Sequence, residues 1–325
     1  MNIPVLWLLN NEEVEPPWGK VARIRVSDIE SVRKYVIIKH IPKIKKEKYK
    51  MNEQSNNVLA EEFRFFMTWG KYRDYKNLKL LISEPNDVRL AVDKAYTDMS
   101  TRTIKGLSLE FKGNEALKKV CKDEKWEETK NSLIDGCKKQ LTDSIIELFK
   151  PYAKATENKT GAENSNIDFS EKLVKISNHF LDDYKSAMEI LNNSILKVPN
   201  STTYRIDVEN IKYGKAQKVV NMTCKYLMLF SDASDYKKVF QQCEMPLDSK
   251  ILEYYNEIIV KSLNESRNNE IQKCTTAWSN LEYEEYKDIQ KNIKEFCERN
   301  KNNDLNLTGY PLIDEFTIWK NQINK

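Results

Sequence analysis

The residues best suited to chemistry lie within residues 204–252. Lys218, Asn221 and Lys225 follow one another at intervals of three and four residues. On a helix this spacing places their side chains on one face, so that two ammonium groups and an amide can meet one site. An acidic residue, Asp248, follows after a polar connection and would begin a second helix.

A lysine that faces an aspartate could attack the sugar of a nucleotide, and the aspartate could assist the attack. A lysine amine that is partly desolvated beside other cations has a lowered pKa and becomes a nucleophile. A carboxylate opposite it could take its proton, or stabilise the positive charge that develops on the sugar as a base departs. Structural roles also fit these residues, because an acid at a helix start caps the helix and a helical lysine is usually solvated.

Two short motifs carry a family resemblance. A Gly-x-Ala-x-Lys motif begins at Gly214 and ends at Lys218, and a Pro-Leu-Asp motif ends at Asp248. Together they resemble the catalytic part of the helix-hairpin-helix DNA glycosylase superfamily, most closely its 8-oxoguanine glycosylase branch. The separation of the lysine and the aspartate is similar to the longer spacing of the archaeal members. Of the two glycines usual in that hairpin, Gly214 alone is present.

The resemblance implies excision of a base from double-stranded DNA. Lys218 would be the Schiff-base nucleophile and Asp248 the assisting carboxylate, with strand cleavage at the resulting abasic site. Lys215 is an alternative nucleophile. Phosphates beside a flipped nucleotide would be held by backbone amides of the hairpin and by nearby cations. The DNA-binding residues that we expect are Lys212, Gly214, Lys215, Asn221 and Lys225.

The sequence leaves the substrate and two other functions open. The excised base could be an oxidised purine, as in repair, or a modified base in foreign DNA, as in antiviral defence. The same fold could instead serve as a DNA-binding module without catalysis. A third hypothesis is a helical protein that binds a protein partner and has no particular affinity for DNA.

The composition excludes several kinds of site. Two histidines, His40 and His179, rule out a histidine cluster and leave little for a Ser-His-Asp relay. The six cysteines form no Cys-x-x-Cys pair, so we expect buried, reduced thiols and no zinc. Only 8 glycines in 325 residues argue against a glycine-rich nucleotide-binding sheet. We expect neither a metal nor a cofactor.

The net charge of +4 does not by itself indicate a nucleic-acid binder. Residues 20–50 are more basic, with eleven Lys and Arg against three Asp and Glu. Tyrosines at Tyr35 and Tyr49 lie among these cations. This stretch could follow a phosphate backbone, or it could be a solvated rim.

The patterns predict an α+β protein that is mainly α-helical. Residues 1–150 read as a mixed region, with β-branched runs within residues 20–38, a short strand at 107–111, and helices at 87–96 and 114–150. We expect the last of these helices to be interrupted near Gly136. Residues 151–168 read as a linker, because their centre lacks any large apolar residue.

Residues 169–325 are predicted to form an all-helical, glycosylase-like domain. Asp168 and Glu171 fit a capping box, and apolar residues then recur every three or four positions as far as Ile195. Another amphipathic helix is expected over residues 278–296, and a short terminal helix begins at Pro311. The apolar start at residues 3–9 is too short to span a membrane, so we expect a soluble, cytoplasmic protein.

Overall fold

The computed structural model describes residues 79–103, 124–153, 169–195, 206, 208–231, 237–266, 270–301, 305 and 307–323. In this part of the chain the regular structure is helical, and β-structure is limited to two isolated bridges, Leu80 with Ser231 and Lys301 with Leu307. The prediction of a mainly helical protein is therefore confirmed for these residues. The strands expected within residues 20–38 and at 107–111 lie outside them.

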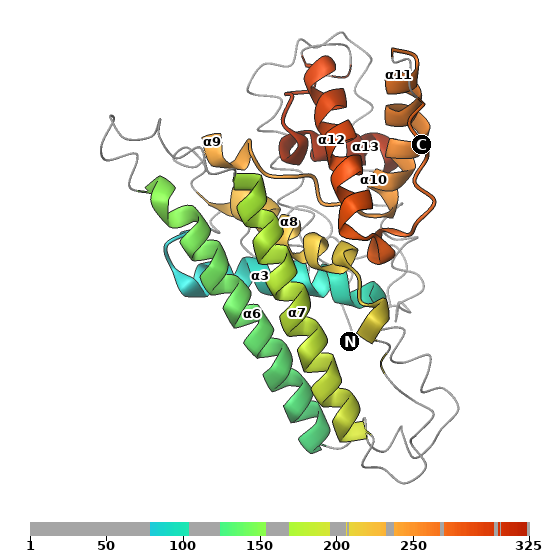
Figure 1. Ribbon diagram of the computed structural model, residues 1–325. Helices are drawn as coiled ribbons and strands as arrows, with labels where there is room; N and C mark the ends of the chain where they lie inside the picture. The colour runs from blue at the N-terminus through green and yellow to red at the C-terminus, as the bar shows by residue number, and fades with distance from the viewer. Residues whose placement is uncertain are drawn as a thin grey trace, which may run out of the picture.

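The elements fall into long helices and short connecting ones (Figure 1). The long helices are α3 (Pro85–Thr103), α6 (Glu124–Ala153), α7 (Phe169–Ile195), α8 (Tyr213–Phe230), α12 (Tyr283–Arg299) and α13 (Pro311–Ile323). The short elements are α9 (Lys237–Phe240), α10 (Ser249–Tyr254), the π-helical turn η4 (Tyr255–Ile259), α11 (Val260–Asn264) and the 3-10 turns η3 (Val208–Asn210) and η5 (Trp278–Asn280).

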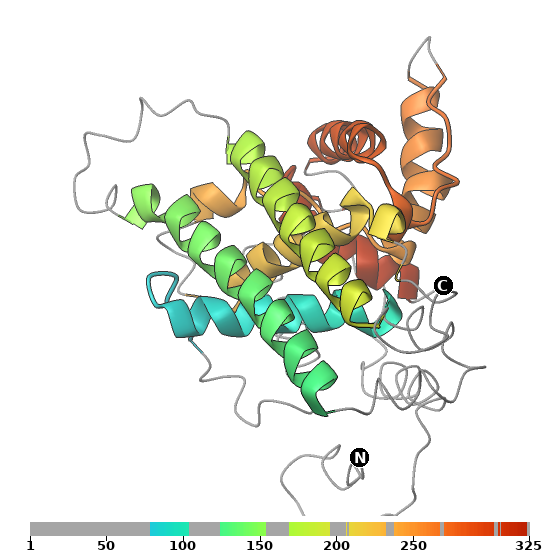
Figure 2. The ribbon, with the colours of Figure 1, turned by 60° about the horizontal axis from the view of Figure 1, so that its bottom comes forward.

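The first group of helices packs around an antiparallel pair. Helices α6 and α7 lie side by side, and α3 crosses them (Figure 2). Helix α8 packs against α3 and α7. The apolar stripe predicted for α7 is confirmed for its described members, because Ile176 is partly buried and the others are buried: Phe169, Leu173, Phe180, Tyr184, Ala187 and Leu191. Burial of such a stripe, more than helix propensity, stabilises a helix of this kind.

Helix α6 differs from its prediction at two points. It continues through Gly136, where we expected an interruption, and it includes Pro151 in its last turn. Glycine costs a helix only about 1 kcal/mol relative to alanine. The buried side chains on both sides of Gly136, such as Ile134 and Leu141, give the helix a reason to continue.

The expected linker does not separate two cores among the described residues. Phe149, near the end of α6, meets Phe169, at the start of α7, edge to face with ring centroids 5.7 Å apart. The Tyr226 hydroxyl of α8 donates a hydrogen bond to the Asp98 carboxylate of α3. Buried residues from α3 to α13 form one hydrophobic cluster. The described part of residues 1–150 therefore shares its core with the residues that follow 168.

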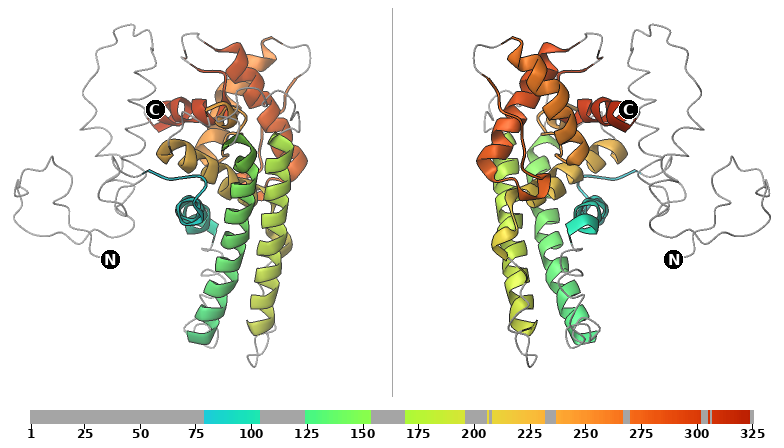
Figure 3. Two further views of the ribbon diagram at one scale, coloured as in Figure 1. Left: turned by 90° about the vertical axis from the view of Figure 1, so that its left-hand side faces the viewer. Right: turned by 90° about the vertical axis from the view of Figure 1, so that its right-hand side faces the viewer.

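The second group comprises α10 to α13 and joins the first through α8 (Figure 3). The predicted amphipathic helix over residues 278–296 is shorter than expected. Helix α12 begins at Tyr283, and Trp278 lies before it in η5. The predicted terminal helix at Pro311 is confirmed as α13.

The described cysteines are thiols without a disulfide partner: Cys137, Cys224, Cys243, Cys274 and Cys297. All of them except Cys274 are buried, and burial raises the pKa of Cys137 to about 11. Within the described ranges, no cluster of three or more His, Cys, Asp or Glu side chains could hold a metal ion. No helix in these ranges is both long and apolar enough to cross a membrane.

The continuity of α6 at Gly136 can be tested by substitution. We expect Gly136→Ala to raise the free energy of unfolding by ~0.5–1 kcal/mol, because alanine loses less backbone entropy in a helix. An added Cβ would have no atom within 4 Å to clash with. Urea denaturation of the parent and the variant measures the difference. A loss of stability would show that the backbone at Gly136 is not helical.

Candidate active site

Helix α8 carries polar side chains through the interior of the protein. Its residues are buried except for Lys215 and Met228, which are partly exposed. The buried polar members are Gln217, Lys218, Asn221, Thr223 and Lys225. Buried polar groups cost free energy unless they are hydrogen-bonded or paired. The position of each side chain is therefore fixed by a partner from the helix itself or from another element.

The start of α8 is fixed by a close approach of backbone to backbone. The Gly214 N–H donates to the Leu281 carbonyl oxygen at 2.9 Å. A Cβ on Gly214 would lie 1.8 Å from the Trp278 carbonyl oxygen. Glycine is needed here because η5 lies against the helix, not because of an unusual backbone dihedral angle. This contact brings Trp278 next to the following turn of α8.

Lys218 and Asp248 meet, as the sequence predicted for a catalytic pair. The Lys218 Nζ lies 3.3 Å from the Asp248 Oδ2. The lysine side chain is 7% exposed and the aspartate side chain 22% exposed, so the pair is at the edge of the core. The same Nζ lies 6.0 Å from the centre of the Trp278 ring. The ammonium thus has an aromatic face and a carboxylate as neighbours.

Asp248 is also the N-cap of α10. Its Oδ1 accepts hydrogen bonds from the N–H groups of Lys250 and Ile251, both at 2.9 Å. One carboxylate oxygen therefore caps the helix while the other faces Lys218. Burial alone would raise the pKa of Asp248, but the Lys218 ammonium, the Ile251 N–H and the Lys225 ammonium together lower it below its ordinary value. The carboxylate is thus ionised at neutral pH.

A second ion pair lies deeper in the same cluster. The Lys225 ammonium binds the Glu315 carboxylate of α13, and both side chains are 2% exposed. The Phe316 ring lies 4.9 Å from the Lys225 Nζ. Burial lowers the pKa of Lys225 and raises the pKa of Glu315, and each partner opposes the shift of the other. The two ion pairs place two cations and two anions along one side of α8.

Three of the expected DNA-binding residues are buried and have internal partners. Lys225 is paired with Glu315, the Gly214 amide is paired with Leu281, and the Asn221 Nδ2 donates to the Tyr286 hydroxyl at 2.8 Å. The phosphate contacts that the resemblance implies for these residues stay a prediction. Their internal contacts follow from the burial of α8, which the isolated pattern of cations did not reveal.

Lys212 and Lys215 lie at the partly exposed start of α8. The Lys212 Nζ is 2.8 Å from a Glu282 carboxylate oxygen, and Lys215 lies in the first turn of the helix. They remain candidates for phosphate contacts. Of the two lysines predicted as nucleophiles, Lys218 makes an ion pair with Asp248.

Trp278 and Glu315 belong to the site but were not predicted as members of it. Trp278 was expected to be a packing residue of a helix, and Glu315 carried no signal of its own. A pair of acidic residues between apolar ones, in the sequence Ile313-Asp314-Glu315-Phe316, is the only trace of its burial. A buried carboxylate implies a buried cation, which could have directed attention to Lys225.

The close approach at Gly214 predicts a strong effect of a single methyl group. We expect Gly214→Ala to lower the free energy of unfolding by ~1–3 kcal/mol or more, because the added Cβ would clash with a backbone oxygen that cannot move alone. Urea denaturation measures the change. Gly136→Ala is the matched control, because the same substitution there is expected to raise the free energy of unfolding. Unchanged stability would mean that η5 does not lie against α8.

The lowered pKa of Asp248 predicts the pH dependence of its contribution to stability. A carboxylate whose folded pKa is depressed stabilises the fold above its unfolded pKa, and that contribution is lost as the pH falls through the folded pKa. Asp248→Asn keeps a capping side chain but removes the charge. The difference in free energy of unfolding between parent and variant should be largest near neutral pH. It should shrink below about pH 4; a difference independent of pH would contradict the ion pair.

The comparisons with known proteins add no relative. The chain has no significant match among protein-family models, curated proteins or solved structures. The functional argument therefore depends on the geometry of the site itself.

Proposed function

We propose that this protein is a DNA glycosylase that excises a damaged or modified base through a Schiff base on Lys218. The observation that carries the proposal is the contact between Lys218 and Asp248, with the Nζ 3.3 Å from Oδ2 at the edge of the core. Lys218 is largely desolvated and lies next to one carboxylate, which could hold the amine in place and stabilise positive charge that develops on the sugar. The motifs that resemble the glycosylase superfamily supply these same two residues.

The reaction balances with the groups present. The Lys218 ammonium first gives one proton to water, and the neutral amine then attacks the deoxyribose C1′ as the bond from C1′ to the base breaks. The base leaves with the bonding electrons and takes up the proton that the new C1′–Nζ ammonium releases. Opening of the sugar ring at the C1′–O4′ bond gives an imine between Nζ and C1′. Loss of a C2′ proton then expels the 3′ phosphate by β-elimination. Water releases the lysine at the end.

The role of Asp248 follows from its charge. Its lowered pKa makes the carboxylate a weak base. That property favours stabilisation of the positive charge on the sugar over removal of the lysine proton. The cap of α10 fixes the carboxylate while it does so, since Oδ1 accepts two backbone N–H groups. The charge is therefore held in place before the reaction begins.

The substrate would be double-stranded DNA with one nucleotide flipped out of the stack. Flipping costs a few kcal/mol, and least for a damaged or mispaired base. Lys212 and Lys215, at the partly exposed start of α8, are placed to meet the phosphates beside it. Two classes of base remain candidates, an oxidised purine and a modified base of foreign DNA.

Borohydride trapping tests the proposal. Duplex oligonucleotides that carry 8-oxoguanine, uracil, hydroxymethylcytosine or an abasic site are incubated with the protein and borohydride, which reduces an imine to a stable amine. We expect a covalent protein–DNA product with the parent and none with Lys218→Gln. Lys215→Gln is the matched comparison, with the same substitution about one turn earlier on α8. It should still give the product, at a lower yield, because it would remove a phosphate contact and leave the nucleophile.

Each outcome identifies one of the candidate functions. A product that disappears with Lys215→Gln and not with Lys218→Gln would move the nucleophile to Lys215. Salt-dependent DNA binding without any product would identify a DNA-binding module. If neither DNA binding nor a trapped product is observed, DNA is excluded as the partner, and the protein-interaction role is left.

A further inference from the structure

The segment that leads to Asp248 is held by a side-chain amide of α8. The Gln217 Nε2 donates to the Leu247 carbonyl oxygen at 3.3 Å, and the Gln217 Oε1 accepts from the Leu247 N–H at 3.4 Å. One amide thus satisfies both backbone groups of one residue. Gln217 is fully buried, so no water replaces these bonds.

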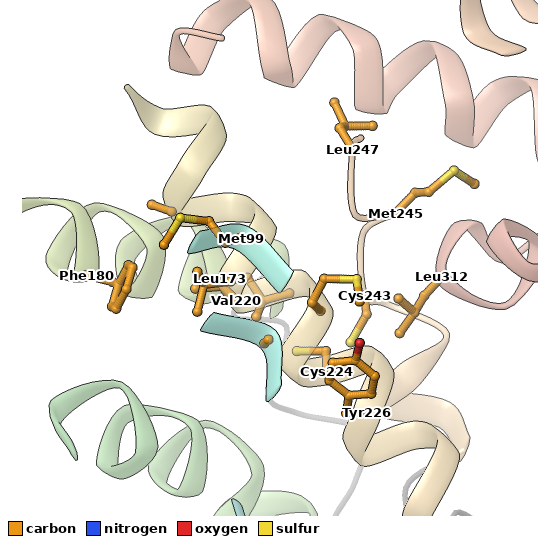
Figure 4. Close-up of a cluster of buried hydrophobic side chains, with 14 of the residues drawn as sticks. Met99, Leu173, Phe180, Val220, Cys224, Tyr226, Cys243, Met245, Leu247 and Leu312 are labelled. Carbon is orange, nitrogen blue, oxygen red and sulfur yellow. The ribbon is translucent and has the colours of Figure 1, made fainter. Parts of the chain in front are cut away.

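A second amide holds the same segment two residues earlier. The Gln290 Nε2 of α12 donates to the Met245 carbonyl oxygen at 2.6 Å, and its Oε1 accepts from the Met245 N–H at 3.3 Å. Figure 4 shows Met245 and Leu247 along this extended segment, which follows Cys243, a neighbour of Cys224 of α8. The side chains of Met245 and Leu247 are buried as well. The two glutamines thus form equivalent contacts at different distances from Asp248.

The two amides differ in what they join. Gln217 precedes Lys218 in the chain, and its partner Leu247 precedes Asp248. The contact between Gln217 and Leu247 therefore ties the two backbones together directly beside the ion pair. Gln290, in contrast, ties Met245 to α12, which carries neither member of the pair.

Gln217 is itself held on its other sides. Its Nε2 also donates to the Gly214 carbonyl oxygen at 2.9 Å, and its Oε1 accepts from the Asn221 Nδ2 at 3.2 Å. Asn221 continues to the Tyr286 hydroxyl, which donates to the Glu244 carboxylate at 2.5 Å. A chain of hydrogen bonds from three elements therefore fixes the orientation of the amide.

We propose that Gln217 is the positioning residue that holds Asp248 at hydrogen-bonding distance from Lys218. The catalytic consequence rests on the proposed glycosylase function, whereas the geometric consequence does not. Gln217 touches neither DNA nor the reacting atoms in this role. It acts through the backbone of Leu247.

A double-mutant cycle tests the geometry without any DNA. Lys218→Met and Asp248→Asn, singly and together, give the coupling between the two charges from urea denaturation. The cycle is measured in the parent, in Gln217→Met and in Gln290→Met. Both methionine variants keep the length of the side chain and leave one backbone N–H and one carbonyl without their amide partner. We expect the coupling to fall below half of its parent value in Gln217→Met and to persist in Gln290→Met.

Trapping rates test the catalytic consequence. With saturating abasic-site DNA, we expect Gln217→Met to lower the rate by about 100-fold, the effect of a displacement near 1 Å at a reacting centre. DNA affinity should stay within about twofold of the parent, since this role involves no DNA contact. The loss in Gln290→Met should be about threefold or less, because Asp248 stays in place. If Gln217→Met does not fold, Gln217→Asn is used instead, since it keeps the amide on a shorter side chain. It should lower both the coupling and the trapping rate, each by less than Gln217→Met.

The outcomes separate this proposal from the proposed function. Equal coupling in the parent and Gln217→Met overturns the positioning role, whatever the DNA results. Equal losses in Gln217→Met and Gln290→Met also overturn it, because the effect would then belong to the whole segment. A coupling that falls only in Gln217→Met, in a protein that never traps DNA, supports the positioning role and rejects the glycosylase.

Discussion

The burial of α8 is the constraint on which the rest of the described structure depends. A helix that is enclosed on nearly all sides is normally apolar all round, yet α8 carries two lysines, a glutamine, an asparagine and a threonine in the interior. Each of these groups needs a partner, because an unpaired buried charge or amide costs several kcal/mol. The arrangement of the second group of helices supplies those partners: Asp248 before α10, Tyr286 in α12 and Glu315 in α13.

Side-chain amides solve a related problem for the extended connections. A helical protein has no sheet to pair the backbone groups of its extended segments, and buried segments of this kind need other partners. In the described residues, an Asn or Gln from a helix repeatedly pairs with the N–H and the carbonyl of a single extended residue. These pairs are Asn192 with Ile206, Gln217 with Leu247, Asn256 with Cys274, Asn264 with Ile271 and Gln290 with Met245. The amides bind the connections to the helices much as a neighbouring strand would.

The sequence predicted those features that depend on neighbours along the chain. The stripe of α7 and the capping position of Asp248 follow from periodicity and helix-terminus chemistry, which act over one or two turns. The prediction that Lys218 and Asp248 lie together came from the family resemblance, and the structure shows their contact. The continuity of α6 at Gly136 was not predicted, because tertiary burial outweighs a penalty of about 1 kcal/mol.

Partners that are distant in the sequence could not be predicted in the same way. Glu315 lies 90 positions after Lys225, and nothing in a single sequence links the two. The burial of Lys225 and Asn221 follows from that packing and cannot be read from the sequence. Their pattern on one helix face was therefore interpreted as a binding surface. Gln217 gave no signal either, since a glutamine beside a lysine is common on exposed helices. Its role depends on the extended segment, whose path only the fold determines.

The two ion pairs of α8 differ in how far they are enclosed. Lys225 and Glu315 are each 2% exposed, whereas 22% of the Asp248 side chain reaches the surface. A fully enclosed pair cannot meet a substrate without unfolding its surroundings, and its attraction serves mainly to offset the cost of burial. In the proposed glycosylase reaction, the pair at the edge would separate to admit the sugar while the deeper pair stays intact. The deeper lysine also helps to lower the pKa of Asp248, so the structural pair keeps the exposed carboxylate charged.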